Sequence, residues 1–154
     1  MKIQLPLLAS LALIACGDPV GPFSGGALSG ETKPSPASWD FAAKVEQVQL
    51  ETDPDQPHSV NTWIGVVNGV AYIPSSMIRG PKLPSEREWV RNVSADDRVR
   101  VRIDGAIYEL RAVRVADSSA EHRAALDELV KKYELVADDL DPDRAIWIYR
   151  LQVR

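Results

Sequence analysis

Cysteine and histidine are almost absent from this chain of 154 residues, which contains one Cys and two His. With Cys16 as the only thiol, no disulfide can form within the chain, so the folded part must be held together by its core. His58 and His122 are each expected to be structural, at a strand edge and on an apolar helix face. The acidic loop over residues 138–143 lacks the glycine and the distal glutamate of a calcium loop. We therefore expect no metal site.

Positive charge is not in excess either. The chain has 18 Lys and Arg against 22 Asp and Glu, which gives a formal net charge of -4. A nucleic-acid-binding protein normally has a basic balance, so we expect no nucleic-acid partner. The cations are concentrated between Arg79 and Arg114, and such a strip is either a solvated sheet face or a place where a small anion binds.

The chain has no apolar run long enough to cross a membrane as a helix. Its longest run, from Leu5 to Ala15, falls short of the ~20 residues required. Lys2 precedes the run and small residues end it, which is typical of a secretory signal peptide. The run ends in Leu13-Ile14-Ala15-Cys16 and resembles the lipobox of bacterial lipoproteins, whose cysteine is linked to diacylglycerol. We expect a signal peptide over residues 1–15 and lipidation of Cys16; an ordinary signal peptide with an incidental cysteine is the alternative.

The lipobox resemblance implies an exported protein that is attached to the cell envelope through the lipid on Cys16. In an organism with two membranes, Gly17 after the cysteine implies the outer membrane, on its periplasmic side. The segment up to Ser38 is rich in Gly, Pro and Ser and has no apolar period, so residues 16–38 are expected to be the lipidated cysteine and a flexible tether. The alternative is an ordered arm over residues 22–30 that packs along the domain.

Two tight-turn dipeptides predict two β-hairpins in residues 39–154, the expected folded domain. Arg98 to Ile103 alternates charged and apolar residues, and Asp104-Gly105 favours a two-residue turn. The resulting ladder sets Val101 opposite Tyr108 and leaves one apolar face and one cationic face, whose arginines we expect to be solvated. Asn68-Gly69 predicts a second hairpin, between strands over residues 60–67 and 70–74.

Two helices complete the expected domain, together with strands over residues 45–51 and 145–153. Ser85 is expected to cap a short helix that contains Trp89. The sequence from Ser118 to Glu121 reads as a capping box that opens a longer helix. Antiparallel hairpins with one short and one longer helix indicate an α+β fold, built on a small antiparallel β-barrel of about six strands.

The middle of the chain carries a family resemblance. In order, it holds Ser76, Arg79-Gly80 and Lys82 in a loop, Trp89 and Asn92 in the short helix, Asp96-Asp97, and finally Arg111-Ala112-Val113-Arg114-Val115. This order resembles the pyridoxamine 5′-phosphate oxidase-like split β-barrels, and most closely their deazaflavin-dependent nitroreductase branch, over about residues 57–133. The resemblance implies a split β-barrel that binds FMN or a deazaflavin and forms a homodimer with its cofactor site across the interface.

Carried over residue by residue, the resemblance places Ser76, Arg79 and Lys82 at the cofactor's phosphate and Asn61 and Trp63 near its ring. Hydroxyl, guanidinium and ammonium groups beside a glycine suit a small anionic cofactor. The alternative is an ordinary polar surface loop. A flavin-type cofactor carries the hydride chemistry itself, so the absence of a nucleophile elbow does not bear on activity.

Two functions therefore stay open. The first is a membrane-anchored nitroreductase-like oxidoreductase, or a flavin-type binder. The second is a non-catalytic envelope lipoprotein that uses the barrel to bind a ligand or a protein and holds no cofactor. Export favours the second, as does the loss of the family's upstream Thr-Gly-Arg-Lys-Ser-Gly phosphate segment, whose place is taken by the strand around Val60 to Ile64. Convergence of Ser76, Arg79 and Lys82 on a pocket would favour the first.

Overall fold

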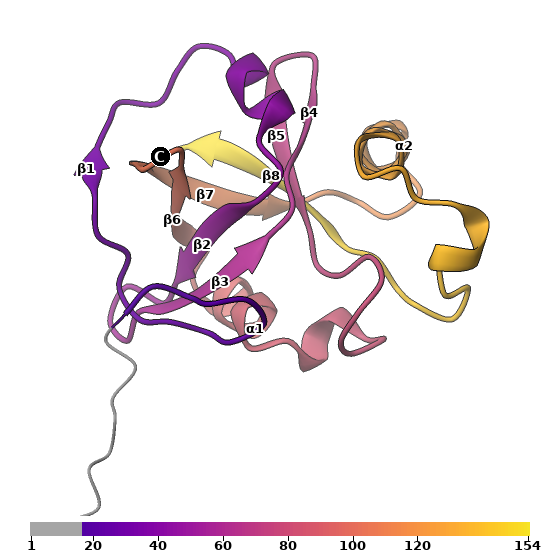
Figure 1. Cartoon of the computed structure of the whole chain (residues 1–154), viewed down its shortest axis with the longest axis horizontal. Coiled ribbons are helices and arrows are strands. Elements are labelled where there is room, and N and C mark those ends of the chain that lie inside the picture. The colour runs from indigo at the N-terminus through magenta and orange to yellow at the C-terminus, as the bar shows by residue number, and fades with distance from the viewer. Residues whose placement is uncertain (1–16) are drawn as a thin grey trace, which may run out of the picture.

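The computed structural model describes residues 17–154, which form one curled sheet with two α-helices against it (Figure 1). The strands are β1 (Glu31–Thr32), β2 (Val48–Thr52), β3 (His58–Thr62), β4 (Gly65–Val67), β5 (Val70–Pro74), β6 (Arg98–Ile103), β7 (Ala106–Arg114) and β8 (Ile148–Val153). The helices are α1 (Glu88–Ala95) and α2 (Ala120–Lys132), with 3-10 turns η1 (Asp40–Lys44), η2 (Pro84–Glu86) and η3 (Ala137–Asp139). The expected signal peptide and Cys16 lie outside the described residues. None of the helices from residue 17 onward is long and apolar enough to cross a membrane.

The sheet is rolled into an incompletely closed barrel. Its strand order is β3-β2-β6-β7-β8-β5-β4, with antiparallel pairing along the whole path, and β1 lies parallel to β7. Strands β3 and β4 end this path on opposite sides, yet only Trp63 and Ile64 separate them in the chain, so the two edges must approach each other. This arrangement confirms the predicted α+β split-barrel class with one short and one longer helix. The described residues form eight strands where about six were expected.

Both predicted hairpins are confirmed in register. In the β6–β7 hairpin, Val101 lies opposite Tyr108, and in the β4–β5 hairpin the pairing closes at Asn68-Gly69. Asp104 and Gly105 have φ angles of 48° and 82°, and Asn68 and Gly69 have 50° and 77°. Positive φ at both central residues defines a type I′ turn, whose twist matches that of the flanking strands. The type I′ geometry of these two turns therefore follows from the two residues at the centre of each turn.

The strand expected over residues 60–67 is instead two strands. β3 ends at Thr62, β4 begins at Gly65, and the chain between them crosses from one edge of the sheet to the other. Ile64 at this break is fully buried, and the end of α2 satisfies its backbone. The Ile64 N–H donates to the hydroxyl of Tyr133, the residue after α2, at 3.0 Å, and the Ile64 carbonyl accepts from Lys132 Nζ at 2.7 Å. The period-two pattern of the sequence continues through residues 63 and 64. Only the contacts with Lys132 and Tyr133, distant in the chain, distinguish this position from a continuous strand.

Both helices begin later than the sequence predicted. The expected cap Ser85 lies within η2, and α1 begins only at Glu88. Helix α2 is capped by Ser119 and not by Ser118; the Ser119 hydroxyl accepts a hydrogen bond from the His122 N–H at 3.0 Å. The capping residue is displaced by two positions in α1, to Arg87, and by one in α2, while each helix itself is present.

Residues 17–33, here called the N-terminal arm, lie along the barrel (Figure 1). Gly25 forms a two-way backbone bridge with Ser59 of β3, with N–O distances of 2.8 and 2.9 Å. Leu28 is 3% exposed, and its N–H donates to the Glu51 carboxylate at 2.5 Å. The described part of the expected tether is therefore not a free linker; it follows the alternative of an ordered arm.

The arm also covers part of the cationic face of β6, where solvated arginines were expected. Arg102 pairs with Asp18 at 2.6 Å and donates to the Ser29 carbonyl at 2.7 Å, and its side chain is only 14% exposed. Arg100 pairs with the buried carboxylate of Glu51 at 2.9 Å. The expectation of solvation is wrong at these two positions because their partners come from the arm and from β2, dozens of residues away in the chain.

Replacing Arg102 with methionine should release the arm. Arg102→Met keeps an apolar stem but removes the contacts with Asp18 and Ser29, so we expect the free energy of unfolding to fall by about 1–3 kcal/mol. Amide hydrogen exchange over residues 18–29 should accelerate. Arg98→Met is the matched control, because Arg98 lies on the same strand and face, is half exposed and pairs with Asp96. It should leave exchange in the arm unchanged; equal acceleration in both variants would contradict the assignment.

Candidate functional site

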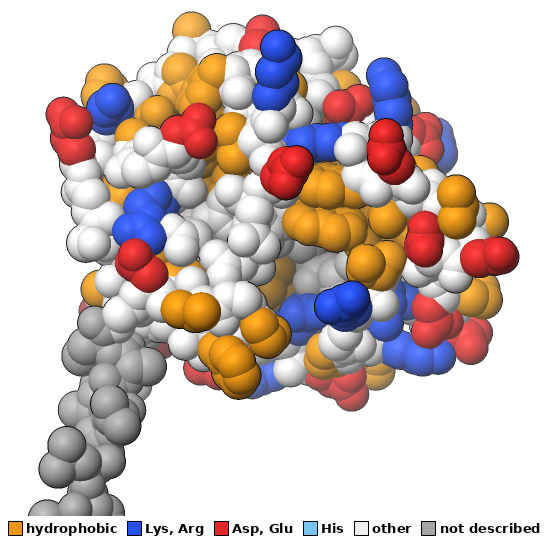
Figure 2. Space-filling model, in the orientation of Figure 1, with side chains coloured by type: hydrophobic (Ala, Val, Ile, Leu, Met, Phe, Trp, Pro, Cys, Tyr) orange, Lys and Arg blue, Asp and Glu red, His pale blue; other side chains and the backbone are white. Residues whose placement is uncertain are grey.

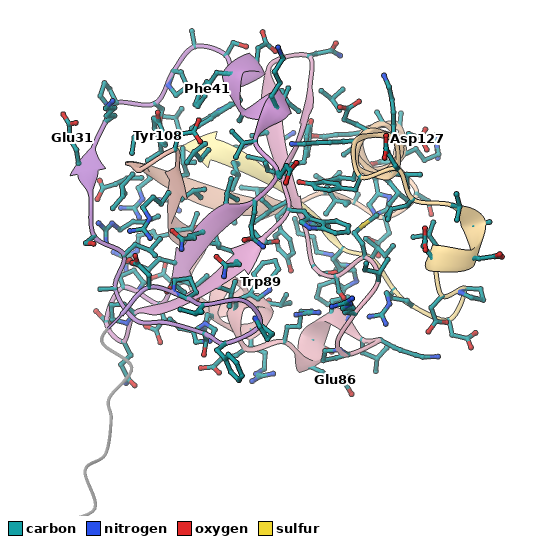
Figure 3. The ribbon with its side chains drawn as sticks, in the orientation of Figure 1. Glu31, Phe41, Glu86, Trp89, Tyr108 and Asp127 are labelled. Carbon is teal, nitrogen blue, oxygen red and sulfur yellow. The ribbon has the colours of Figure 1, made fainter. Side chains whose placement is uncertain are left out.

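A cleft of about 530 Å³ opens between the β3 edge, the loop after β5 and the N-terminal arm. Residues 60–63 and 74–79 form two of its walls, Gly21-Pro22 of the arm forms a third, and Arg87 and Trp89 close the base. Trp89 is buried and projects from α1 toward the sheet (Figure 3). The volume lies within the range of about 300–1,000 Å³ that is usual for small-molecule sites.

Four of the five predicted cofactor-binding residues line this one cleft: Asn61, Trp63, Ser76 and Arg79. They come from the end of β3 and from the loop that follows β5. These two segments adjoin because β3 and β5 lie near opposite ends of the strand order and the sheet curls to bring those ends together. The structure therefore brings the four together from separate segments.

Lys82 does not line the cleft. Its ammonium group pairs with Asp141 at 2.9 Å and lies 3.8 Å from Asp143, and more than half of the side chain is exposed. The hydrogen bond to Asp141 raises the pKa of Lys82 and lowers the pKa of Asp141. The acidic loop over residues 138–143 thus supplies the partner of Lys82.

Two arginines that the sequence did not single out bring positive charge to Ser76: Arg87 lines the cleft, whereas Arg144 lies outside the cleft lining but reaches the same hydroxyl. Arg87 donates to the Ser76 hydroxyl at 2.9 Å and to the Arg79 carbonyl at 2.6 Å. Arg144 donates to the same hydroxyl at 3.1 Å and to the Pro81 carbonyl at 2.8 Å. The Nε groups of both arginines are buried without an acceptor in the described chain, and neither guanidinium forms an ion pair within residues 17–154.

The Arg87–Arg144 pair concentrates uncompensated positive charge beside Ser76. Burial lowers the pKa of Arg87, and the charge of Arg144 lowers it further, although a guanidinium stays protonated in proteins. Carbonyl oxygens hold the two groups in place but carry only partial charge. Asp141 offsets some of this charge from outside the cleft, since Arg144 contributes to lowering the pKa of Asp141. A bound anion would neutralise the remainder and accept the orphaned N–H groups.

Trp63 is fixed in the cleft wall by Tyr133. The two rings stack with centroids 4.1 Å apart and planes tilted by 10°. The Tyr133 hydroxyl accepts from the Ile64 N–H at 3.0 Å and donates to the Glu46 carbonyl at 2.7 Å, so two hydrogen bonds hold the Tyr133 ring in place. Trp63 and Gln47 also line a second hollow, of about 650 Å³, on the side of Tyr133. Trp63 therefore forms the partition between the two hollows.

Asn61 is engaged by the arm. Its side-chain nitrogen donates to the carbonyls of Pro19 at 3.2 Å and Gly21 at 3.1 Å. The residue predicted to lie near a cofactor ring thus holds the arm against the cleft. No signal in the sequence links these positions, which are about forty residues apart in the chain.

The fold is shared with several solved structures, while no family model and no curated protein matches the chain. A conserved hypothetical protein from Mycobacterium tuberculosis has a TM-score of 0.56 at 21% identity, covering 75% of this chain and 77% of that one. An F420-H2 dependent reductase has a TM-score of 0.54 at 16% identity, covering 82% and 100%. A FAD-binding protein from Mesorhizobium loti has a TM-score of 0.50 at 15% identity, covering 75% and 84%. At these identities the likeness establishes the fold alone, a split barrel.

Tyr133→Phe should weaken the barrel and change its response to alkali. Loss of the hydroxyl leaves the Ile64 N–H without its acceptor, so we expect the free energy of unfolding to fall by about 1–3 kcal/mol at neutral pH. Burial raises the pKa of Tyr133 from 10.0 to about 12. Because the folded-state pKa is the higher one, the contribution of Tyr133 is complete below pH 10.0 and is lost as pH rises through about 12.

Denaturant unfolding of both chains from neutral pH to about pH 12 measures this effect. The stability difference between the native chain and Tyr133→Phe should shrink as pH rises. Tyr108→Phe is a suitable control, since the Tyr108 hydroxyl forms no hydrogen bond within the described residues, and it should cost less at neutral pH. A constant difference between native and Tyr133→Phe chains across the range would show that the Tyr133 hydroxyl does not make this contribution.

Proposed function

We propose that this chain is a lipid-anchored envelope protein whose cleft binds FMN or a deazaflavin and that it acts as a nitroreductase-like oxidoreductase. One observation carries the proposal: the cleft combines an aromatic wall at Trp63 with Arg87 at its Ser76 end, where Arg144, from outside the cleft lining, donates to the same Ser76 hydroxyl. A planar ring that bears a phosphate needs both features, an apolar slot and a concentrated positive charge.

The residues present fit the phosphate of such a cofactor. Guanidinium groups recognise phosphate oxygens through parallel N–H donors, and Arg87 and Arg144 each retain a buried Nε–H without an acceptor in the described chain. Ser76 stands between the two and adds a hydroxyl. A phosphate here would offer the two guanidinium groups a full negative charge in place of the partial charge of carbonyl oxygens.

The other walls suit a flat ring. Val60, Trp63, Met77 and Ile78 supply apolar surface, and Trp89 closes the base, where it lies edge-on to Tyr149 with ring centroids 5.3 Å apart. When bound, a flavin or deazaflavin supplies the hydride chemistry, and the task of the chain is to bind and orient it. The F420-H2 dependent reductase and the FAD-binding protein that share this fold support the proposal.

A homodimer is part of this proposal. Split barrels of the resembled family place the cofactor between two subunits, and a solved structure described as a domain-swapped dimer has a TM-score of 0.55 with this chain at 17% identity. The cleft is not enclosed by the residues that line it, so a second subunit would have room to complete it.

The alternative function is a non-catalytic envelope lipoprotein that uses the barrel to bind another ligand or a protein. The observation that favours it is the use of Asn61 by the arm. Part of the cleft wall is formed by the chain's own Gly21-Pro22, so less of the slot is free for a ring.

Titration of the full chain with FMN, and separately with a reduced deazaflavin, tests the proposed function. Ligand fluorescence should change, and Arg87→Met and Arg144→Met should each weaken binding roughly ten- to a hundredfold, because a hydrogen bond to a charged group is worth about 1.5–3 kcal/mol. Lys82→Met is the control, since Lys82 pairs with Asp141, and its affinity should stay within about twofold of the native chain.

Near-ultraviolet circular dichroism establishes that each variant is folded. Equal weakening by Lys82→Met would mean that binding depends on overall charge and not on the Arg87–Arg144 pair. No binding of either cofactor by the native chain would reject the cofactor and leave the alternative function. If a cofactor binds, its reduced form should pass hydride to a nitroaromatic acceptor faster with the chain than without it; equal rates would reject the oxidoreductase.

A further inference from the structure

The arm ends in an apolar turn that is open to solvent. Val20 and Phe23 have exposed fractions of 71% and 74%, the two highest among the exposed large hydrophobic side chains of residues 17–154. They flank Gly21-Pro22, and two reciprocal backbone hydrogen bonds of 3.1 and 3.0 Å pair them directly. Residues paired in this way project their side chains to the same side. The turn therefore presents a small apolar patch to solvent, formed by Val20 and Phe23.

This apolar turn is held rigidly against the barrel on both flanks. Before it, Asp18 pairs with Arg102 at 2.6 Å, and the Pro19 carbonyl accepts from Asn61. After it, the two-way backbone bridge of Gly25 attaches the arm to β3. With both flanks fixed, Val20 and Phe23 are held outward, away from the protein's own core.

The residue expected to carry the lipid stands just before the turn. Cys16 immediately precedes Gly17, so the membrane attachment proposed above begins four residues from Val20. A segment this short keeps the turn within reach of the bilayer interface. The short covalent connection to Cys16 therefore suffices to keep the apolar turn close to the bilayer to which the chain is attached.

Charge on the same side of the molecule suits anionic headgroups. Arg79 is exposed, lines the same cleft as Gly21-Pro22 and forms no ion pair within the described residues. Figure 2 shows hydrophobic side chains gathered at the lower edge of the molecule, with Lys and Arg as well as Asp and Glu side chains around them. Apolar residues flanked by cations are typical of segments that lie in the membrane interface.

We propose that the turn from Val20 to Phe23 inserts into the interface of the bilayer to which the chain is attached. The barrel then sits with the mouth of its cleft at the membrane surface, because Gly21-Pro22 belongs to both the turn and the cleft wall. A ligand dissolved in the membrane interface could enter the cleft from that side. This inference rests on the proposed membrane attachment but not on the proposed cofactor.

Tryptophan quenching tests the insertion. The full chain, as Phe23→Trp or Val153→Trp, is reconstituted into vesicles of phosphatidylethanolamine and phosphatidylglycerol whose acyl chains carry bromine. Val153 is the matched control because it is 62% exposed and lies at the end of β8. Phe23→Trp should be quenched by at least about twofold more than the parent chain, and Val153→Trp should match the parent. Bromine on the acyl chains reports insertion and not mere nearness to headgroups.

Flotation of the parent chain with the vesicles separates the possible failures. If the chain floats but Phe23→Trp is quenched no more than Val153→Trp, the insertion is wrong while the attachment stands. If the chain does not float, the insertion and the membrane attachment are both wrong. The cofactor titration still tests, independently, whether the cleft binds FMN or a deazaflavin. A blue shift of Phe23→Trp that grows with protein concentration in the absence of vesicles would assign the turn to a second copy of the chain and overturn the inference. If the turn inserts, the parent chain should change the order of the lipid acyl chains. The double variant Val20→Ser with Phe23→Ser should no longer produce this change.

Discussion

The buried carboxylate of Glu51 is the contact on which the arrangement of this molecule depends. It is 5% exposed, Arg100 binds both of its oxygens at 2.9 Å, and Leu28 of the arm donates to one of them at 2.5 Å. A buried charge is tolerated only when it is paired and hydrogen-bonded, so the buried carboxylate of Glu51 requires both Arg100 and the Leu28 N–H. It thereby joins three parts of the chain: β2, the β6–β7 hairpin and the arm. The path of the arm sets where Gly21-Pro22 lies, so a charge pair remote from the cleft determines one of the walls of the cleft.

The parts of the fold that could be predicted are those whose cause is local. Asp104-Gly105 and Asn68-Gly69 favour positive φ by their own chemistry, and the strand register followed from the turns. The break at Trp63–Ile64 has a distant cause, since the side chains of Lys132, at the end of α2, and of Tyr133, which follows it, hydrogen-bond to the Ile64 backbone between β3 and β4. A period-two pattern that runs through such a break contains no sign of it. The covered arginines of β6 escaped prediction for the same reason, because the covering segment reads locally as a linker.

In the cleft, residue type was predictable, whereas the partner of each charge was not. Ser76 and Arg79 stand in a loop whose composition suits an anion, and the structure lines one cleft with both. Lys82 looks equivalent in the sequence, yet Asp141 neutralises it from a loop almost sixty residues away. Arg144 carries no local signal, because it follows a run of aspartates and reaches Ser76 only through the packing of two loops. Such a site is therefore defined by cations that have no carboxylate close to them in space. The sequence does not show which residues are close in space.

The arm gives the cleft two halves with different energetics. At the Ser76 end, Arg87 and Arg144 are already held in place by carbonyl groups, so an anion replaces contacts with partial charge by contacts with full charge. At the Asn61 end, the amide donors are bonded to the arm, and a ligand that takes them must first break the bonds to Pro19 and Gly21. An exchange of one hydrogen bond for another contributes little net affinity. The affinity of this cleft must therefore come from its anion-binding end and from apolar contact with Trp63, while Asn61 sets how closely the arm encloses whatever is bound.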